Sequence, residues 1–168
     1  MVRLGVGYPR RMTRPTVLFK GLDERATIPK YHSQAAAGLD LAVCLPRGPF
    51  ESESVEIVPM HRGGKILKLP CGLACAIPEG FEGQVRPRSG LATKFGITIP
   101  NAPGTIDSDY RGEMFVALIN LGPEPITISH GDRVAQLVIA PIAHAHIEQV
   151  EALDETKRGA GGFGSTGL

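Results

Sequence analysis

The sequence lacks three features that would each direct the search for a function. No apolar run approaches the roughly 20 residues that a membrane-spanning helix needs, so we expect no membrane partner. Neither sign of charge is in excess, since 18 Lys and Arg residues face 17 Asp and Glu residues. Binding to nucleic acid through bulk charge usually requires a strongly basic protein, so no nucleic-acid partner is expected. The first residues also lack the apolar core of a signal peptide, because Gly5, Gly7 and Pro9 interrupt it, which favours a cytoplasmic location.

Cysteine is scarce and its count is odd. The three residues are Cys44, Cys71 and Cys75. A CxxxC spacing without a second cluster of ligands is a weak zinc signal. We therefore interpret these cysteines as small buried hydrophobic residues in a reducing compartment.

Glycine and proline are abundant, with 21 and 14 residues, which is about twice their usual share. The short apolar runs between them argue against a helical bundle and predict many short strands joined by tight turns. Because 42% of the residues are hydrophobic, the chain is expected to fold around a core. Strands are predicted at residues 16–20, 38–45, 54–58, 65–77 (two segments broken near residues 70–72), 83–86, 95–100, 113–121, 126–129, 133–141 and 145–150.

This number of short strands in one domain predicts an all-β fold, either a barrel or a jelly-roll-like sandwich. One short helix is expected over residues 89–94. Ser89 is its predicted N-cap, and Gly96 is the predicted stop.

Composition divides the chain into three parts. Residues 1–14 are basic and are interpreted as a flexible extension, in which Met12 resembles an alternative start. Residues 15–153 form the predicted barrel domain. In the tail, residues 154–168, five of the ten positions from Arg158 to Gly167 are Gly, so it cannot hold a structure of its own. The tail is either a disordered end or a segment that orders over a nucleotide, because Gly lets backbone approach an anion and Phe stacks on a base.

The segment at residues 86–94 is a candidate anion site. Ser89 and Gly90 open the predicted helix, so free backbone N–H groups point outward beside the Arg88 guanidinium. The alternative is an ordinary capped helix with a solvated arginine.

Residues 101–112 are a candidate catalytic segment. Two turns flank residues 105–107, and a strand returns after them, which predicts a hairpin with a carboxylate near its end. Asp107 or Asp109 could act as a general base there. The alternative is an ordinary acidic turn.

Three further segments place polar residues beside apolar ones. Arg133 and Gln136 are expected on the polar side of a strand, where Asp132 would form a structural ion pair with Arg133. Asp40 lies in an apolar strand, which is unfavourable unless the carboxylate is paired or faces a metal-bound water. His144 and His146 are expected on one face of a strand and are interpreted as surface residues.

Five segments, in this order, resemble the five ordered motifs of the trimeric dUTP pyrophosphatase (dUTPase) family. They read AGLDL, PRSGLA, GTIDSDYRG, GDRVAQL and RGAGGFGSTG. The run IDSDYRG and the last motif are highly specific, and the resemblance extends from about Thr16 to Gly167.

The resemblance implies hydrolysis of dUTP to dUMP and pyrophosphate with Mg²⁺, which keeps uracil out of DNA and supplies dUMP for dTTP synthesis. It also implies a jelly-roll β-barrel and a homotrimer in which each active site draws motifs from all three chains. Two alternatives stay open. One is a dCTP deaminase, possibly bifunctional, which would need a Glu-centred site that reads the base and a different tail. The other is a catalytically inactive module that senses nucleotides.

The resemblance further implies roles for the residues of the third motif. Asp107 would be the general base that orients and deprotonates the attacking water. Tyr110 would pack beneath the deoxyribose and leave no room for a 2′-hydroxyl. The uracil edge would be read by Asn101, Thr105, Ile106 and Phe115.

The phosphates would be held by the second, fourth and fifth motifs. The groups implied for the α- and β-phosphates are Arg88, Ser89, Gly90 and Gln136. Arg158 would clamp the γ-phosphate, and the lid over the nucleotide would consist of Phe163, stacked on uracil, with Gly164, Ser165 and Thr166. Mg²⁺ would be held by triphosphate oxygens and waters without a direct protein ligand, and Asp40 would act on the water shell.

Overall fold

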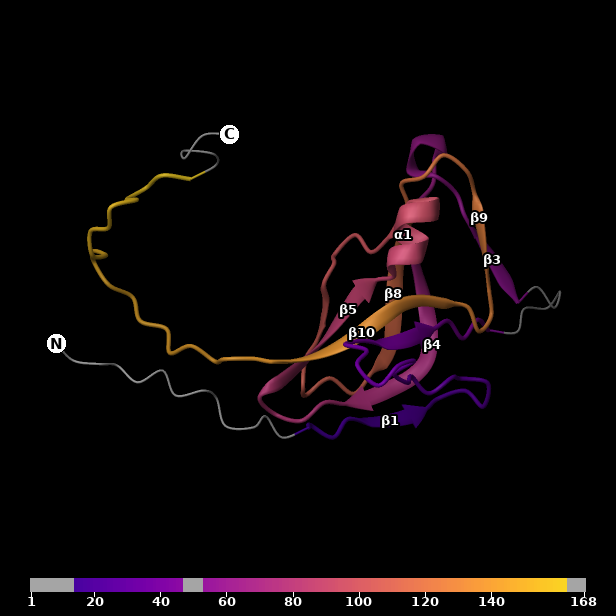
Figure 1. Cartoon of the computed structure of the whole chain (residues 1–168), viewed down its shortest axis with the longest axis horizontal. Coiled ribbons are helices and arrows are strands. Elements are labelled where there is room, and N and C mark those ends of the chain that lie inside the picture. The colour runs from indigo at the N-terminus through magenta and orange to yellow at the C-terminus, as the bar shows by residue number, and fades with distance from the viewer. Residues whose placement is uncertain (1–13, 47–52, 163–168) are drawn as a thin grey trace.

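The computed structural model describes residues 14–46 and 53–162 (Figure 1). Within them the chain forms two four-stranded antiparallel sheets and a separate two-stranded ribbon. The first sheet has the order β1 (Leu18–Gly21), β4 (Leu67–Ala76), β8 (Glu113–Asn120) and β6 (Ile97–Thr98). The second has the order β2 (Leu39–Ala42), β10 (Arg133–Pro141), β5 (Phe81–Pro87) and β7 (Gly104–Ile106). The ribbon pairs β3 (Ser54–Ile57) with β9 (Ile126–Ser129), and the helices are η1 (Met60–Arg62) and α1 (Ser89–Phe95).

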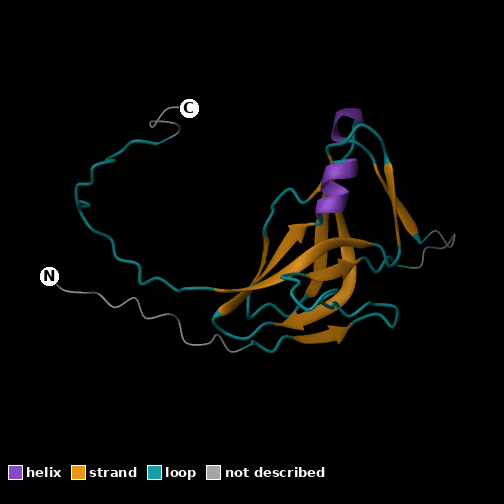
Figure 2. Cartoon of the chain, viewed as in Figure 1, coloured by secondary structure: helices purple, strands orange, loops and turns teal. Residues whose placement is uncertain are grey.

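The core cluster combines residues from both sheets, whose strands are orange in Figure 2. Strand β8 shows how the sequence builds it, because Met114, Val116 and Leu118 are buried while the residues between them face outward. Leu73 on β4 and Leu137 on β10 meet in the same cluster. The expected all-β fold with one short α-helix is confirmed.

Strand β4 corrects the prediction of two segments broken near residues 70–72. It is one strand whose pairing with β8 shifts register between Pro70 and Ala74. Gly72 takes a φ of 64° inside this irregularity, and its N–H donates to Oε1 of Glu113 at 3.0 Å. The side chain supplies the acceptor that the ladder loses, so the strand continues through the proline.

The predicted hairpin over residues 101–116 is wrong. Strand β7 pairs with β5, where Gly104 lies opposite Val85, whereas β8 pairs with β4 and β6. Residues 107–112 therefore carry the chain from one sheet to the other. The sequence marks both turns, but the partner of a three-residue strand is decided by the packing of the whole fold.

Residues 145–150 form no strand in the single chain. The segment after β10 runs away from the sheets as an extended loop (Figure 1). Its apolar side chains are open to solvent, with Ile147 84% and Leu153 86% exposed. His144 and His146 lie on this loop and are exposed as expected, although they share no strand.

Helix α1 begins at Ser89, as predicted, but Arg88 and not Ser89 is its N-cap, with extended backbone angles and no side-chain cap. The helix ends at Gly96, as predicted, where φ is 70°. Across residues 14–46 and 53–162, no helix is long and apolar enough to span a bilayer.

All three cysteines are free and buried, which confirms their interpretation as small core residues. Burial raises the pKa of Cys71 to about 12. It also raises the pKa of Cys44 and of Cys75.

Candidate active site

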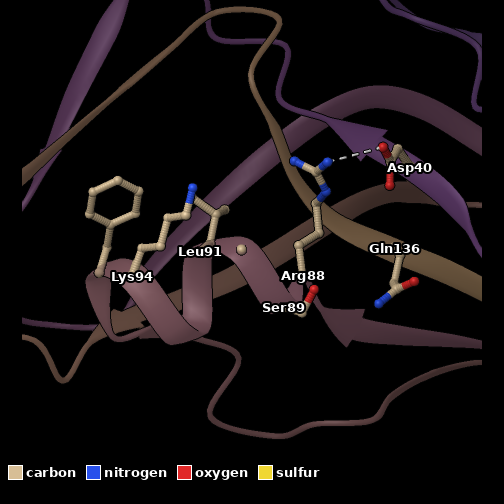
Figure 3. Close-up of a pocket in the computed structure, with 8 residues that line it drawn as sticks. Asp40, Arg88, Ser89, Leu91, Lys94 and Gln136 are labelled. Carbon is tan, nitrogen blue, oxygen red and sulfur yellow. Dashed lines mark ion pairs between the residues drawn. The ribbon is translucent and has the colours of Figure 1, made fainter.

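The second and fourth motifs meet in one cavity of about 340 Å³. We call it the Arg88 cavity, and its lining consists of Asp40, Arg88, Ser89, Gly90, Leu91, Lys94, Phe95 and Gln136 (Figure 3). Strand β10 lies between β2 and β5, so that Gln136 stands opposite both Asp40 and Arg86. This register brings three distant parts of the sequence to the start of helix α1.

The carboxylate of Asp40 is the centre of an ionic network beside this cavity. Its Oδ2 lies 3.0 Å from Nη1 of Arg133, 3.3 Å from Nη2 of Arg88 and 3.4 Å from Nε2 of His32. Arg88 also donates to the backbone carbonyl of Arg133 at 2.7 Å. The sequence left two alternatives for Asp40, pairing or a metal-bound water, and these contacts show the pairing.

The predicted ion pair between Asp132 and Arg133 is wrong. Arg133 turns to Asp40, and Oδ2 of Asp132 accepts the backbone N–H of Ser129 at 2.8 Å. Asp132 lies before β10 and closes the turn there, whereas the register with β2 brings Asp40 within reach of Arg133.

Gln136 is held tightly at the wall of the cavity. Its Nε2 donates to the carbonyl of Pro87 at 2.9 Å. A Cβ on Gly38 would lie 2.7 Å from Oε1 and 3.2 Å from Cβ of Gln136, so the glycine lets the amide stay in this position. Gln136 thereby connects the first motif to the turn that carries Arg88, and its contact with phosphate stays a prediction.

Lys94 was missed by the sequence reasoning. It lines the Arg88 cavity and adds a second basic side chain to it (Figure 3). The available signal was helical spacing, since Lys94 follows Gly90 by four residues and Leu91 by three, which puts all three on one face.

Asp107 lies elsewhere in the single chain. Its exposed side chain lines a separate cavity of about 830 Å³, the Asp107 cavity, together with Ser108, Asp109 and Arg111. The turn that carries it is closed internally: the N–H of Tyr110 donates to the Asp107 carbonyl at 3.1 Å. Nη1 of Arg111 donates to the carbonyls of Ser108 and Tyr110 at 2.6 and 2.8 Å.

The ring of Tyr110 packs on the backbone of Gly112. A Cβ on Gly112 would lie 2.6 Å from the ring carbon Cζ, and the Tyr110 hydroxyl donates to the Glu113 carbonyl at 2.8 Å. The side chain is 43% exposed, so this fixed ring still offers a face to a ligand.

The remaining residues implied for uracil are spread over two sheets. Asn101 is exposed in the turn before β7, Thr105 is exposed on β7, and Ile106 is buried. Phe115 lies on β8 in the other sheet, where Nζ of Lys68 sits 3.9 Å from its ring centroid.

Arg158 belongs to the segment that leaves the barrel, and its Nε donates to the nearby carbonyl of Gly161 at 2.8 Å. It does not line the Arg88 cavity. Phe163, Gly164, Ser165 and Thr166 lie outside the described residues, as do residues 1–13 of the predicted extension.

The single chain thus assembles Arg88, Ser89, Gly90 and Gln136 but holds Asp107 in a different cavity. Such an arrangement offers cationic and hydroxyl donors for phosphate in one place and a carboxylate for proton transfer in another.

The model of the dUTPase family matches residues 24–167. The chain belongs to the dUTPase family. A deoxyuridine 5'-triphosphate nucleotidohydrolase of Desulfotalea psychrophila is 53% identical over 145 residues, which cover 86% of this chain and 90% of the relative. The enzyme of the same name from Rhizobium etli is 51% identical over 158 residues, which cover 93% of this chain and 96% of the relative.

A solved dUTPase shares the fold. The structure of the Staphylococcus bacteriophage 80alpha dUTPase with dUPNHPP has a TM-score of 0.76 and 26% sequence identity to this chain. The likeness covers 91% of this chain and 99% of the phage enzyme. The resemblance drawn from the five motifs is therefore confirmed at the level of the family and of the fold.

Proposed function

We propose that this dUTPase hydrolyses dUTP to dUMP and pyrophosphate by attack of water on the α-phosphorus. The reaction keeps uracil out of DNA and supplies dUMP for dTTP synthesis. The observation that carries the proposal is the Arg88 cavity, where groups from three distant motifs converge. Relatives that are about half identical over nearly their full length bear the corresponding name.

The Arg88 cavity suits the phosphate chain of the nucleotide. The Arg88 guanidinium and the Lys94 ammonium supply positive charge, and Ser89 supplies a hydroxyl donor. Arg88 is already oriented by Asp40 and by the Arg133 carbonyl, so little side-chain freedom is lost when phosphate binds. The roles of Arg88, Ser89, Gly90 and Gln136 in phosphate binding are part of the proposal.

Asp107 acts as the general base in this proposal. Its exposed carboxylate can accept a proton from water, and the bonded turn from Asp107 to Tyr110 holds the backbone that carries it. Tyr110 presents its ring to the sugar, and the uracil edge is read by Asn101, Thr105, Ile106 and Phe115.

The family is one of divalent-metal-dependent enzymes, and we propose Mg²⁺ as the ion. When bound to the triphosphate, the ion would supply positive charge that offsets the charge of the phosphates. Within residues 14–46 and 53–162 no group of three His, Cys, Asp or Glu side chains is placed to hold an ion. The donor set fits an ion held by phosphates and water: Asp40 uses Oδ2 for its ion pairs, and Oδ1 remains to accept a hydrogen bond from a metal-bound water.

A homotrimer with shared active sites completes this proposal. One copy holds Arg88 and Asp107 in separate cavities, so a second copy must bring its own third motif to the first. The loop after β10 also exposes Ile147, Val150 and Leu153, apolar side chains that a neighbouring copy would cover. We expect the mass of the native protein to be three times 17.9 kDa.

The tail serves as the lid of this shared site. Its described part reaches away from its own barrel, which suits a segment that closes over another copy (Figure 1). Arg158 would pair with the γ-phosphate, and Phe163, Gly164, Ser165 and Thr166 would cover the base and phosphates. The division into an extension, a barrel and a tail stays a prediction, as does the cytoplasmic location.

The proposed function is tested by turnover of dUTP, dCTP, dTTP and UTP with Mg²⁺, with pyrophosphate and ammonia followed separately. We expect pyrophosphate from dUTP and little product from the others. Ammonia from dCTP would identify a deaminase, and absence of any product would identify an inactive nucleotide-binding module. Native mass spectrometry of the same sample measures the number of copies.

A further inference from the structure

Asn120 lies at the end of β8. Among the described residues it is the one polar residue that is buried, with 0% exposure. Its Nδ2 donates to the carbonyl of Ile57 at 2.9 Å and to that of Glu124 at 2.8 Å. Its Oδ1 accepts the N–H of Gly122 at 2.8 Å. A buried amide whose donors and acceptor are all bonded fixes the segments around it, because moving any one of them leaves a polar group without a partner.

The turn that Asn120 fixes touches the end of helix α1. The N–H of Leu121 donates to the carbonyl of Gly96, the residue that ends the helix, at 2.9 Å. A Cβ on Gly96 would lie 2.7 Å from Cα of Gly122, and a Cβ on Gly122 would overlap the carbonyl of Phe95. The two backbones are therefore in direct contact, with no side chain between them that could absorb a displacement.

Helix α1 connects this contact, at its C-terminal end, to the Arg88 cavity at its first turn. The helix has seven residues, so it is only about 10 Å long. Its first turn lines the cavity with Ser89 and Gly90, while Asp40 and Gln136 line it from the second sheet. Asn120 belongs to the first sheet, where it pairs with Ile97 immediately after the helix. The width of the cavity thus depends on how α1 is anchored to the first sheet.

We propose that Asn120 is a positioning residue for phosphate binding in the Arg88 cavity. It touches no part of the nucleotide and acts by fixing the end of α1, which in turn places Arg88 and Ser89 against Gln136. The inference rests on the proposed function, since it takes the Arg88 cavity as the phosphate site. It makes different predictions for two parts of the nucleotide. Binding of phosphate depends on Asn120, and binding of the nucleoside does not.

The test compares Asn120→Ala with Glu124→Gln in the full-length protein. Glu124 provides only its backbone carbonyl to Asn120, while its side chain pairs with Arg62 on the surface, so the control removes a nearby ion pair and leaves the network intact. The measurements are the Kd for inorganic pyrophosphate and the Kd for deoxyuridine, which has no phosphate. Because misplacement of binding groups by about 1 Å costs one to two orders of magnitude, we expect roughly tenfold weaker pyrophosphate binding by Asn120→Ala. Deoxyuridine binding should stay within about twofold, and Glu124→Gln should resemble the wild type.

Equal losses for both ligands would show a general structural defect and overturn the proposal, and so would unchanged pyrophosphate binding. Turnover of dUTP by the wild-type protein tests the proposed function separately.

Should Asn120→Ala fail to fold, hydrogen exchange in the wild-type protein tests the role of Asn120. Coupling between two sites is reciprocal, so saturating pyrophosphate should slow exchange of the Leu121 and Gly122 amides. The His130 amide, which donates to the Glu53 carbonyl and takes no part in the Asn120 network, is the control. Unchanged exchange at Leu121 and Gly122 would overturn the inference.

Discussion

The guanidinium of Arg133 lies 3.0 Å from the carboxylate of Asp40, although 93 positions separate the two residues in the sequence. The side chain of Asp40 is only 16% exposed, and it also orients Arg88. Two arginines that share one carboxylate leave net positive charge at the edge of the Arg88 cavity. Asp40 therefore both neutralises a charge within a strand and orients Arg88 at the cavity.

We expect Asp40→Asn to raise the KM for dUTP by roughly tenfold, since hydrogen bonds to charged groups are worth about 1.5–3 kcal/mol and Arg88 would lose its orientation. The Mg²⁺ concentration for half-maximal rate should rise as well. Steady-state kinetics over a range of Mg²⁺ measures both. Asp132→Asn is the matched control, because Asn can still accept the Ser129 N–H there. Identical kinetics for the two variants would contradict a role of Asp40 in the site.

Asp107→Asn should lower kcat by about 100-fold or more, because an amide cannot take the proton of the attacking water. Nucleotide binding should stay near normal, since the bonds that close the turn use the backbone of residue 107. Pyrophosphate release measures the first effect, and calorimetric titration with a non-hydrolysable dUTP analogue measures the second. Asp109→Asn is the control in the same cavity, and full turnover by Asp107→Asn would refute the assignment.

Tyr110→Ala should reduce the selectivity for dUTP over UTP, because removal of the ring opens space for a 2′-hydroxyl. The informative control is Tyr110→Phe, which keeps the ring on Gly112 and loses only the bond to the Glu113 carbonyl. The ratio of kcat/KM for the two nucleotides should fall by about tenfold in the alanine variant and little in the phenylalanine variant. An unchanged ratio in Tyr110→Ala would rule out steric exclusion by this ring.

Truncation after Thr156 should reduce activity by about tenfold or more, because Arg158 and the rest of the proposed lid are lost. The barrel should keep its melting temperature, since the hydrogen bonds of residues 156–161 are local to the tail. Turnover and thermal unfolding are measured on the same sample. Removal of Leu168 alone, which lies beyond the matched family residues, is the control. Full activity of the truncated chain would exclude a lid.

Alkaline pH should destabilise the protein through Cys71. Burial raises the pKa of this thiol from 9.0 to about 12, so above pH 9 the unfolded chain releases a proton that the folded chain retains. The contribution of Cys71 to the free energy of unfolding is therefore fully present below pH 9. It is lost between pH 9 and 12, by up to about 1.4 kcal/mol per pH unit for one thiol. Urea unfolding at several pH values measures this slope. Cys71→Ala should show a shallower slope, and equal slopes would contradict the prediction.

The sequence predicted best where local pattern decides the structure. Strands β9 and β10 have the bounds that alternation indicated, and Gly96 ends the helix because a left-handed residue is needed there. Pairing of Asp40 was one of two alternatives expected on energetic grounds, since a carboxylate in an apolar strand requires a partner or a metal-bound water. The cavity residues Arg88, Ser89, Gly90 and Gln136 were anticipated because each belongs to a recognisable motif, whereas Lys94 was missed.

The errors concern partners that local pattern does not encode. Arg133 could pair with its neighbour Asp132 or with Asp40 across the sheet, and only the register of β10 decides between them. The partner of β7 depends in the same way on how the sheets close. Asn120 gave no signal, because an asparagine at the end of an apolar strand looks like an ordinary turn residue until its three bonds are known.

The separation of Arg88 and Asp107 within one chain has a consequence for dosage. If complete sites exist only in a trimer, their number rises with the third power of chain concentration where most chains are monomers. Halving the supply of chains would then remove about seven-eighths of the working sites. The rate of dUTP hydrolysis would then fall steeply as the abundance of chains decreases. In an enzyme with its whole site in one chain, the rate would fall only in proportion.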